Sequence, residues 1–212
     1  CGLTTTCGPS CGSSAASACG AVVAANRLLE HRFSNVELDE LAMAGEMIAS
    51  GSRHADNLAP CIYGGFTLVR SSEPLDIVEI AFPELYAPVI HPLIEVKTSE
   101  ARAILPKDVP LREAVRNWSN LGAFVAALST GDLDLLARSM VDTIVEPARR
   151  ALIPRFDELK SASLAAGAIG GGISGSGPSV FMLSESREIA EFVREAMNIV
   201  YAPTGIDFNT YV

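Results

Sequence analysis

The sequence predicts an α+β protein, and the order of its segments carries this prediction. Segments with helical spacing of apolar residues fill the first part of the chain, and runs rich in Ile, Val, Phe and Tyr follow them. Further helical segments come next, and a strand–loop–strand–helix–strand pattern closes the chain. Segregation of this kind favours α+β over a doubly wound parallel sheet, in which strands and helices alternate.

Each expected element follows from its local sequence. Small residues and a serine N-cap open a helix over 13–31, and aliphatic spacing predicts a second helix over 35–50. The pair Asn35 and Leu38 is no capping box, and 51–60 is read as a polar loop. We expect strands at 63–70, 76–82, 87–90, 93–97, 168–173, 179–183 and near 206–211, and helices at 99–105, 111–128, 133–143, 155–166 and 187–199.

Composition excludes several classes of protein. With 49% hydrophobic and 19% charged residues, the 212-residue chain is not of the disordered type and can bury a core. Its formal charge of −9 and the absence of any basic run argue against a nucleic-acid partner. The longest apolar or small run, around 15–25, is shorter than the ~20 residues of a membrane span, so we expect no membrane partner.

The cysteines predict reduced thiols. There are five, an odd number, and four lie within the first nineteen residues, which is a poor disulfide framework. All three histidines lie downstream of this cluster, which disfavours zinc. We therefore expect a soluble cytoplasmic protein. The chain opens on Cys1 without a leader peptide, and we expect it to be cut from a longer one.

The first candidate site is the segment 12–16 at the start of the first helix. Backbone N–H groups and the helix dipole favour phosphate there, and a serine hydroxyl can add a magnesium ligand, although serine-capped helices are mostly structural. On the second helix, Glu46 is either a paired or metal-bound acid or a carboxylate at the solvated edge. The loop that follows gathers His54, Asp56 and Asn57.

The second candidate site is the Gly/Ser loop 172–178. Glycines 170, 172 and 175 match G-x-G-x-x-G, but a strand follows where the dinucleotide fingerprint requires a helix, so that reading is rejected. The chain contains no Gly-Lys pair and hence no Walker motif. Arginine binds carboxylates bidentately, and the groups near predicted helix starts that could recognise a small acid are Thr98, Arg102, Arg149 and Arg150.

Taken together, these segments resemble the homoserine kinases of the GHMP kinase superfamily. The order that carries the resemblance is GSSAASA, Glu46, GSRHADNLAPC, GGFTLVR, TSEARAILP, EPARRALIP and GISGSGP. The resemblance implies a two-domain fold: the remainder of an N-terminal ATP-binding domain in 1–62, its first portion lacking, and a ferredoxin-like C-terminal α/β sandwich in 63–212. It also implies ATP-dependent phosphorylation of the L-homoserine hydroxyl in threonine biosynthesis, with Mg²⁺, and a homodimer as in many relatives.

The resemblance also implies roles for individual residues. Gly8, Gly12, Ser13 and Ser14 would bind the ATP phosphates, with Ser14 and Glu46 as magnesium ligands. The catalytic residues would be Asn57 and Asp56, and the substrate-binding residues His54, Thr98, Arg102, Arg149, Gly175, Ser176 and Gly177. Because Asn57 stands where many relatives place a basic Asp, direct transfer is the implied mechanism.

The phosphate loop departs from the family pattern, since Pro9 and Ser10 stand where the family has Ser and Gly. Two alternatives therefore stay open. One is another GHMP kinase acting on mevalonate-like or sugar substrates, and the other is a non-catalytic fragment that keeps the fold.

Overall fold

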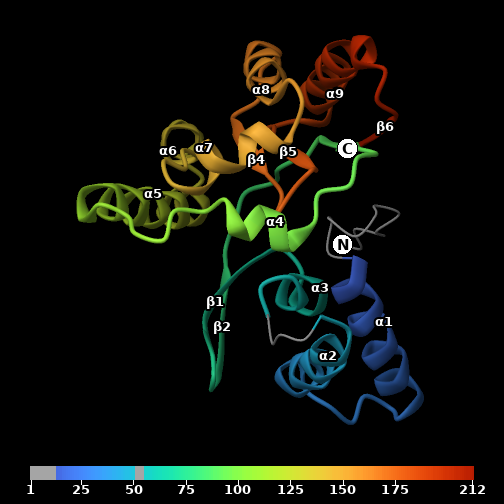
Figure 1. Ribbon diagram of the computed structural model, residues 1–212. Helices are drawn as coiled ribbons and strands as arrows, with labels where there is room; N and C mark the ends of the chain where they lie inside the picture. Colours follow the sequence, from blue (N-terminus) through green and yellow to red (C-terminus); the bar gives the residue numbers. More distant parts are fainter. Residues whose placement is uncertain (1–12, 51–54) are drawn as a thin grey trace. The chain divides into compact units, whose positions relative to one another are not determined.

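The computed structural model describes residues 13–50 and 55–212, and they form two compact units (Figure 1). The first unit ends at Ala81 and the second begins at Phe82. This division of the chain lies nineteen residues after the expected domain boundary at 62/63, which stays a prediction. The physical reason for the difference is that Val69 and Leu75, from the segment after residue 65, pack against the core of the first unit.

The described residues of the first unit form three helices and a hairpin. Its elements are α1 (Ser13–Leu28), α2 (Asn35–Ser50), α3 (Leu58–Tyr63), β1 (Phe66–Ser72) and β2 (Leu75–Ile80). The three helices pack on one another, and the two strands pair antiparallel. Small side chains dominate their shared core, with Ala15, Cys19, Ala42, Met43, Ala55 and Leu58 buried. Such residues allow close approach of the helices.

Helix α2 begins with a capping box formed by Ser34 and Glu37, whereas the sequence analysis considered only the pair Asn35 and Leu38, which forms none. The Ser34 hydroxyl accepts a hydrogen bond from the Glu37 amide at 3.4 Å, and the Glu37 carboxylate accepts one from the Ser34 amide at 2.8 Å. This reciprocal pair satisfies two amides at the helix start. The helix spans the predicted range 35–50.

The second unit is built on a four-stranded antiparallel sheet of order β4-β5-β3-β6. Its strands are β3 (Val89–Pro92), β4 (Gly170–Ile173), β5 (Val180–Leu183) and β6 (Phe208–Tyr211). Its helices are α4 (Thr98–Ala103), α5 (Leu111–Thr130), α6 (Leu133–Ser139), α7 (Val145–Arg149), α8 (Phe156–Ala165) and α9 (Arg187–Tyr201), with short 3₁₀ turns at Arg150–Leu152 and Ala202–Thr204. Numbered in chain order the strands read 2-3-1-4, which is the ferredoxin-like arrangement with α4 to α8 in the first crossover and α9 in the second. The predicted α+β class is confirmed.

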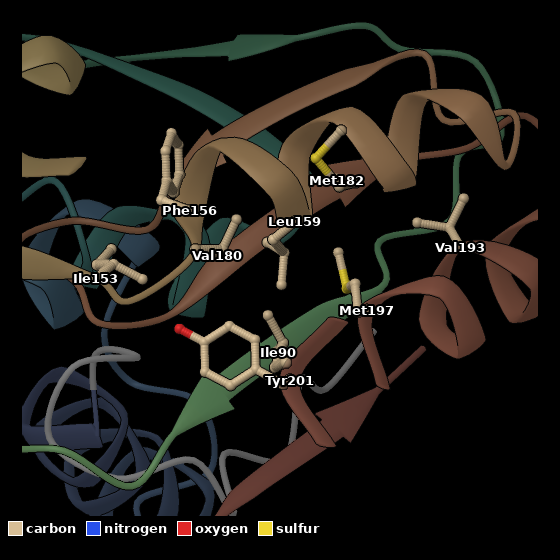
Figure 2. Packing of buried hydrophobic residues seen from close by; sticks show 9 residues of the cluster. All are labelled: Ile90, Ile153, Phe156, Leu159, Val180, Met182, Val193, Met197 and Tyr201. Atoms are coloured by element: carbon tan, nitrogen blue, oxygen red, sulfur yellow. The ribbon is translucent and has the colours of Figure 1, made fainter. Parts of the chain in front are cut away.

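The main core lies between this sheet and helices α8 and α9. Figure 2 shows nine of its side chains: Ile90, Ile153, Phe156, Leu159, Val180, Met182, Val193, Met197 and Tyr201. The α9 residues recur every three to four positions and form one apolar stripe. Because side chains alternate along a strand, the neighbours His91 and Phe181 belong to the opposite face of the sheet.

Close packing explains the glycines of β4. A Cβ on Gly171 would lie 2.1 Å from the Phe181 carbonyl oxygen, and one on Gly172 would lie 2.7 Å from a Glu146 carboxylate oxygen. Strand β5 at Gly171 and helix α7 at Gly172 therefore approach β4 more closely than a larger residue allows.

Three expectations about single elements are corrected. The range 93–97 is not a strand: β3 ends at Pro92, and pairing extends only to the Leu93 amide, which donates to Asp207. Helix α6 ends at Ser139 rather than near 143. Residues 58–63, expected as the end of a polar loop and the start of a strand, form helix α3.

Candidate active site

The expected phosphate and metal residues of the first unit fall on the ends of its helices. Ser13 and Ser14 are the first two residues of α1, and Glu46 lies half-buried in the last turns of α2. Gly8, Gly12 and His54 lie outside the described residues. The first turn of a helix presents backbone N–H groups without intrahelical partners, which suits an anion.

Helices α1 and α2 approach each other closely where these residues lie. A Cβ on Gly45 would lie 3.9 Å from the Cβ of Ala18. Ser14 precedes Ala18 by one helical turn, and Glu46 follows Gly45 directly. The two residues expected to bind magnesium are thus placed on adjoining turns of two packed helices.

Asp56 and Asn57 lie exposed at the start of α3. The Asp56 carboxylate accepts a hydrogen bond from the Asn57 amide at 3.2 Å. Asn57 occupies the N-cap position, but its side chain makes no capping bond to the helix. The carboxamide of Asn57 is therefore exposed and not engaged in capping α3.

The core beneath these helices contains a buried carboxylate that the sequence analysis did not single out. Asp39 of α2 is 0% exposed, and neither of its oxygens has a hydrogen-bond partner within the described part of the chain. Burial raises the pKa of Asp39 to about 6. Burial, followed by the nearby Cys61, Asp39 and Glu46, raises the pKa of Cys19 to about 12, so this thiol stays protonated. Both described cysteines, Cys19 and Cys61, are free.

In the second unit, Arg149 joins two of the predicted substrate segments. Its Nε donates to the Ala101 carbonyl of α4 at 3.2 Å, and its Nη1 donates to the Gly175 carbonyl at 2.8 Å. Ala101 is flanked by Arg102, which is exposed on the same short helix that begins at Thr98. The junction therefore brings Arg149, the TSEAR helix and the Gly/Ser loop together. Arg150, by contrast, pairs with Asp157 at 3.1 Å on the surface.

The Gly/Ser loop between β4 and β5 is closed by backbone bonds. The Ser174 amide donates to the Ser179 carbonyl at 2.8 Å, and the Gly177 amide donates to the Ser174 carbonyl at 3.0 Å. Gly175 (φ +58°) and Gly177 (φ +83°) adopt left-handed backbone conformations that glycine tolerates. Gly177 is buried, whereas Gly175 is exposed and Ser176 is half-buried between them. The loop thus presents its tip to the surroundings from a fixed base.

Helix α7, which carries Arg149 at its end, is fixed at its start by Asp142. The Asp142 carboxylate accepts hydrogen bonds of 2.8 to 3.0 Å from the amides of residues 144, 145 and 146, and another from the Asn117 side chain at 2.9 Å. Burial acts to raise the pKa of Asp142, but these hydrogen bonds outweigh it and lower the pKa below its ordinary value. A second restraint is the Lys160–Glu146 ion pair, 2.6 Å long, with side chains only about one-fifth exposed.

A cavity of about 290 Å³ lies beside this helix in the second unit. Residues of α5, α7 and β4 line it together with Asp142, Gly175 and Phe181. Its size suits a small metabolite, and its lining is mixed, with aromatic rings, amides and carboxylates among the lining side chains.

Sequence reasoning missed the groups that hold the predicted residues in place. Neither Asp142 and Asn117 nor the buried pair of His91 and Ser179 was singled out. A signal was present only for Asp142, an acidic residue just before the EPARR segment, where an N-cap is common. The other contacts join residues far apart in the chain.

Comparison with known proteins agrees with this arrangement. The chain matches the GHMP kinases N terminal domain over residues 8–65 and GHMP kinases C terminal over residues 124–203. It is 50% identical over 187 residues to a homoserine kinase of Chlorobium phaeobacteroides, covering 88% of this chain and 58% of that protein. A crystal structure of homoserine kinase from Cytophaga hutchinsonii superposes with a TM-score of 0.91 at 52% identity, covering 94% of this chain and 64% of that one. Mevalonate kinase from L. major shares the fold, with a TM-score of 0.74 at 18% identity.

The chain belongs to the GHMP kinase superfamily. It spans about three-fifths of the length of the relatives that it matches at about half identity. Those relatives are homoserine kinases, and the resemblance drawn from the sequence is confirmed. None of the described helices is both long and apolar enough to cross a membrane.

Proposed function

We propose that the protein phosphorylates the side-chain hydroxyl of L-homoserine with ATP, giving O-phospho-L-homoserine for threonine biosynthesis. Sequence identity of about 50% to homoserine kinases supports this proposal. The structural observation that carries it is the Arg149 junction, which places a guanidinium beside the TSEAR helix and the Gly/Ser loop. Membership of the kinase family makes ATP the expected phosphate donor.

The Arg149 junction suits the carboxylate of an amino acid. A guanidinium has five N–H donors, and the bonds to Ala101 and Gly175 use two of them. The remaining donors can bind a carboxylate, and Arg102, next to Ala101, would add a second cation. Thr98 and the loop residues Gly175, Ser176 and Gly177 would orient the rest of the amino-acid group.

The first unit would bind the phosphates of ATP. Gly8, Gly12, Ser13 and Ser14 would contribute through backbone amides and hydroxyls at the start of α1. A serine hydroxyl and the carboxylate of Glu46 are oxygen donors of the kind that Mg²⁺ prefers, so these residues fit the ion. When bound, Mg²⁺ would offset the negative charge of the transferring phosphoryl group.

Direct transfer is the reaction that these residues support. The homoserine hydroxyl oxygen would bond to the γ-phosphorus while the bond from that phosphorus to ADP breaks, and the hydroxyl proton is released. Asn57 cannot take up a proton as a carboxylate does, so it would orient the hydroxyl together with His54 and Asp56. Catalysis would then rest on positioning and electrostatic stabilisation.

We further propose a cytoplasmic location and a homodimer. The two described cysteines are free, as expected in a reducing compartment. The dimer rests on the family resemblance, and sedimentation of the purified protein at two concentrations tests it.

A coupled ADP-release assay with Mg-ATP tests the function, using the longest product that the gene encodes. L-homoserine is the substrate, and L-threonine, L-serine and mevalonate are the controls. We expect turnover with homoserine, abolished in Glu46→Ala and reduced modestly in Asn57→Ala. Equal, small losses in both variants would contradict the roles assigned to them. Turnover with mevalonate alone would indicate another GHMP kinase, and no turnover from folded protein would indicate a non-catalytic fragment.

A further inference from the structure

The sheet of the second unit contains a buried polar pair that the proposed reaction does not use. His91 of β3 and Ser179, just before β5, are 7% and 0% exposed. The His91 Nδ1 lies 2.7 Å from the Ser179 Oγ, within hydrogen-bond distance, although the residues are 88 positions apart. Burial lowers the pKa of His91, so the ring is neutral near pH 7. A hydroxyl can both donate and accept, so it can bond to the ring in either tautomer.

The pair connects a rigid part of the sheet to the base of the Gly/Ser loop. β3 is a central strand, hydrogen-bonded on one side to β5 and on the other to β6. Ser179 is the residue whose carbonyl accepts the Ser174 amide and closes the loop. The hydrogen bond from His91 therefore fixes the residue on which the closure of the loop depends.

The loop in turn fixes the orientation of Arg149. Gly175, the residue after Ser174, accepts a hydrogen bond from Arg149 at 2.8 Å, and the same guanidinium reaches the TSEAR helix through Ala101. Three hydrogen bonds and the peptide link between Ser174 and Gly175 thus connect the centre of the sheet to the cation expected at the substrate carboxylate. A shift of the loop base would move the Gly175 carbonyl and release one of the two bonds that hold Arg149.

We propose that His91 and Ser179 are positioning residues, which hold the Gly/Ser loop in the register that orients Arg149 for the substrate carboxylate. The identity of the substrate in this inference rests on the proposed function. The control of the loop by the pair rests only on the hydrogen bonds described above. The pair touches neither homoserine nor ATP in this account. Its loss is therefore expected to weaken homoserine binding and to leave ATP binding unchanged.

The test compares Ser179→Ala, Ser179→Thr and His91→Phe with a matched control, Ser184→Ala. Ser184 is a buried serine just after the other end of β5, and its hydroxyl has no hydrogen-bond partner within the described part of the chain. Three quantities are measured on the full-length protein. They are KM for homoserine, KM for ATP, and amide hydrogen exchange in a peptide covering 174–179. Thermal unfolding of each variant establishes that it is folded.

We expect Ser179→Ala and His91→Phe to raise KM for homoserine about tenfold, to change KM for ATP less than twofold, and to speed exchange in the loop. Ser179→Thr, which keeps the hydroxyl, should show the wild-type KM for homoserine and wild-type loop exchange. Ser184→Ala should change neither of these two quantities. Unchanged loop exchange and unchanged KM in folded Ser179→Ala protein would overturn the proposal, and so would equal rises in both KM values. If the wild-type protein does not turn over homoserine, the proposed function fails, and loop exchange alone still decides whether the pair controls the loop.

Discussion

The buried carboxylate of Asp39 predicts an unusual pH dependence of stability. Burial raises the pKa of Asp39 from its ordinary value of 3.8 to about 6, so the folded state holds the proton more tightly than the unfolded chain does. The free energy of unfolding is therefore highest when Asp39 is protonated and decreases as the pH rises from about 4 to about 6. Raising the pKa by about two corresponds to a decrease of about 3 kcal/mol in the free energy of unfolding across this pH range.

The perturbation that tests this reasoning is Asp39→Asn, which keeps the shape of the protonated acid and cannot ionise. At pH 7.5 the variant should be more stable than the wild type by up to about 3 kcal/mol, and its advantage should shrink by about 2 kcal/mol at pH 4.5. Glu40→Gln is the matched control, because it removes the same charge from an exposed neighbouring position of α2. It should be nearly neutral at both pH values.

The assay is urea unfolding followed by far-UV circular dichroism at the two pH values. Because Trp118 is the only tryptophan and lies in α5, its fluorescence reports on the second unit separately. Exchange of α2 amides gives the free energy of the first unit. The reasoning is refuted if Asp39→Asn is less stable than the wild type at pH 7.5, or if the difference between the two proteins does not change with pH.

Three further substitutions test the packing of the second unit by denaturant unfolding. Asp142→Ala removes the acceptor for the amides of residues 144, 145 and 146 at the start of α7 and should cost about 2 kcal/mol; an unchanged midpoint would contradict its capping role. Gly171→Ala should cost about 3 kcal/mol, since the added Cβ would meet the Phe181 carbonyl oxygen; wild-type stability would show that β4 has room. Tyr201→Phe removes a 2.7 Å hydrogen bond from the buried phenol to the Pro154 carbonyl and should cost about 1 kcal/mol, with no loss expected if that bond is not formed.

Gly122→Ala is the control for the glycine substitution. Gly122 lies within α5, and a Cβ there would meet no atom within 4 Å. Alanine is the better helix former, so this variant should gain up to about 1 kcal/mol.

Much of the fold could be predicted because local sequence and tertiary structure agree. The range of α2 and the starts of α5 and α9 follow from apolar spacing and turn residues, and the structure confirms them. The ferredoxin-like sheet was expected from the resemblance, and the strand order bears it out.

The sequence analysis did not expect the two short helices α3 and α7, and it read residues 51–60 as a polar loop. Each of these helices carries a proline at its third position, Pro60 and Pro147. In the first turn of a helix a backbone N–H has no intrahelical partner, so proline is tolerated there. The strand expected at 93–97 is absent from the described sheet for another reason: β6 begins only at Phe208, opposite Pro92, and pairing beyond it is limited to the bond from the Leu93 amide to the Asp207 carbonyl.

The candidate site, like the fold, could be predicted from the sequence only in part. Motifs could indicate Arg149, Arg102 and the Gly/Ser loop as substrate residues, and these assignments remain predictions. The bonds from Arg149 to Ala101 and Gly175 could not be predicted, because they span 48 and 26 positions and depend on how the crossover folds onto the sheet.

The most direct test of the central claim links Arg149 to the substrate carboxylate. We would measure kcat/KM for L-homoserine and for homoserinol, its analogue with an alcohol in place of the carboxylate, in the wild type and in Arg149→Gln. The account predicts a loss of at least a hundredfold for homoserine in the variant and less than threefold for homoserinol, because only the first substrate offers a carboxylate to the guanidinium. Equal losses for both substrates, or none for homoserine, would contradict it.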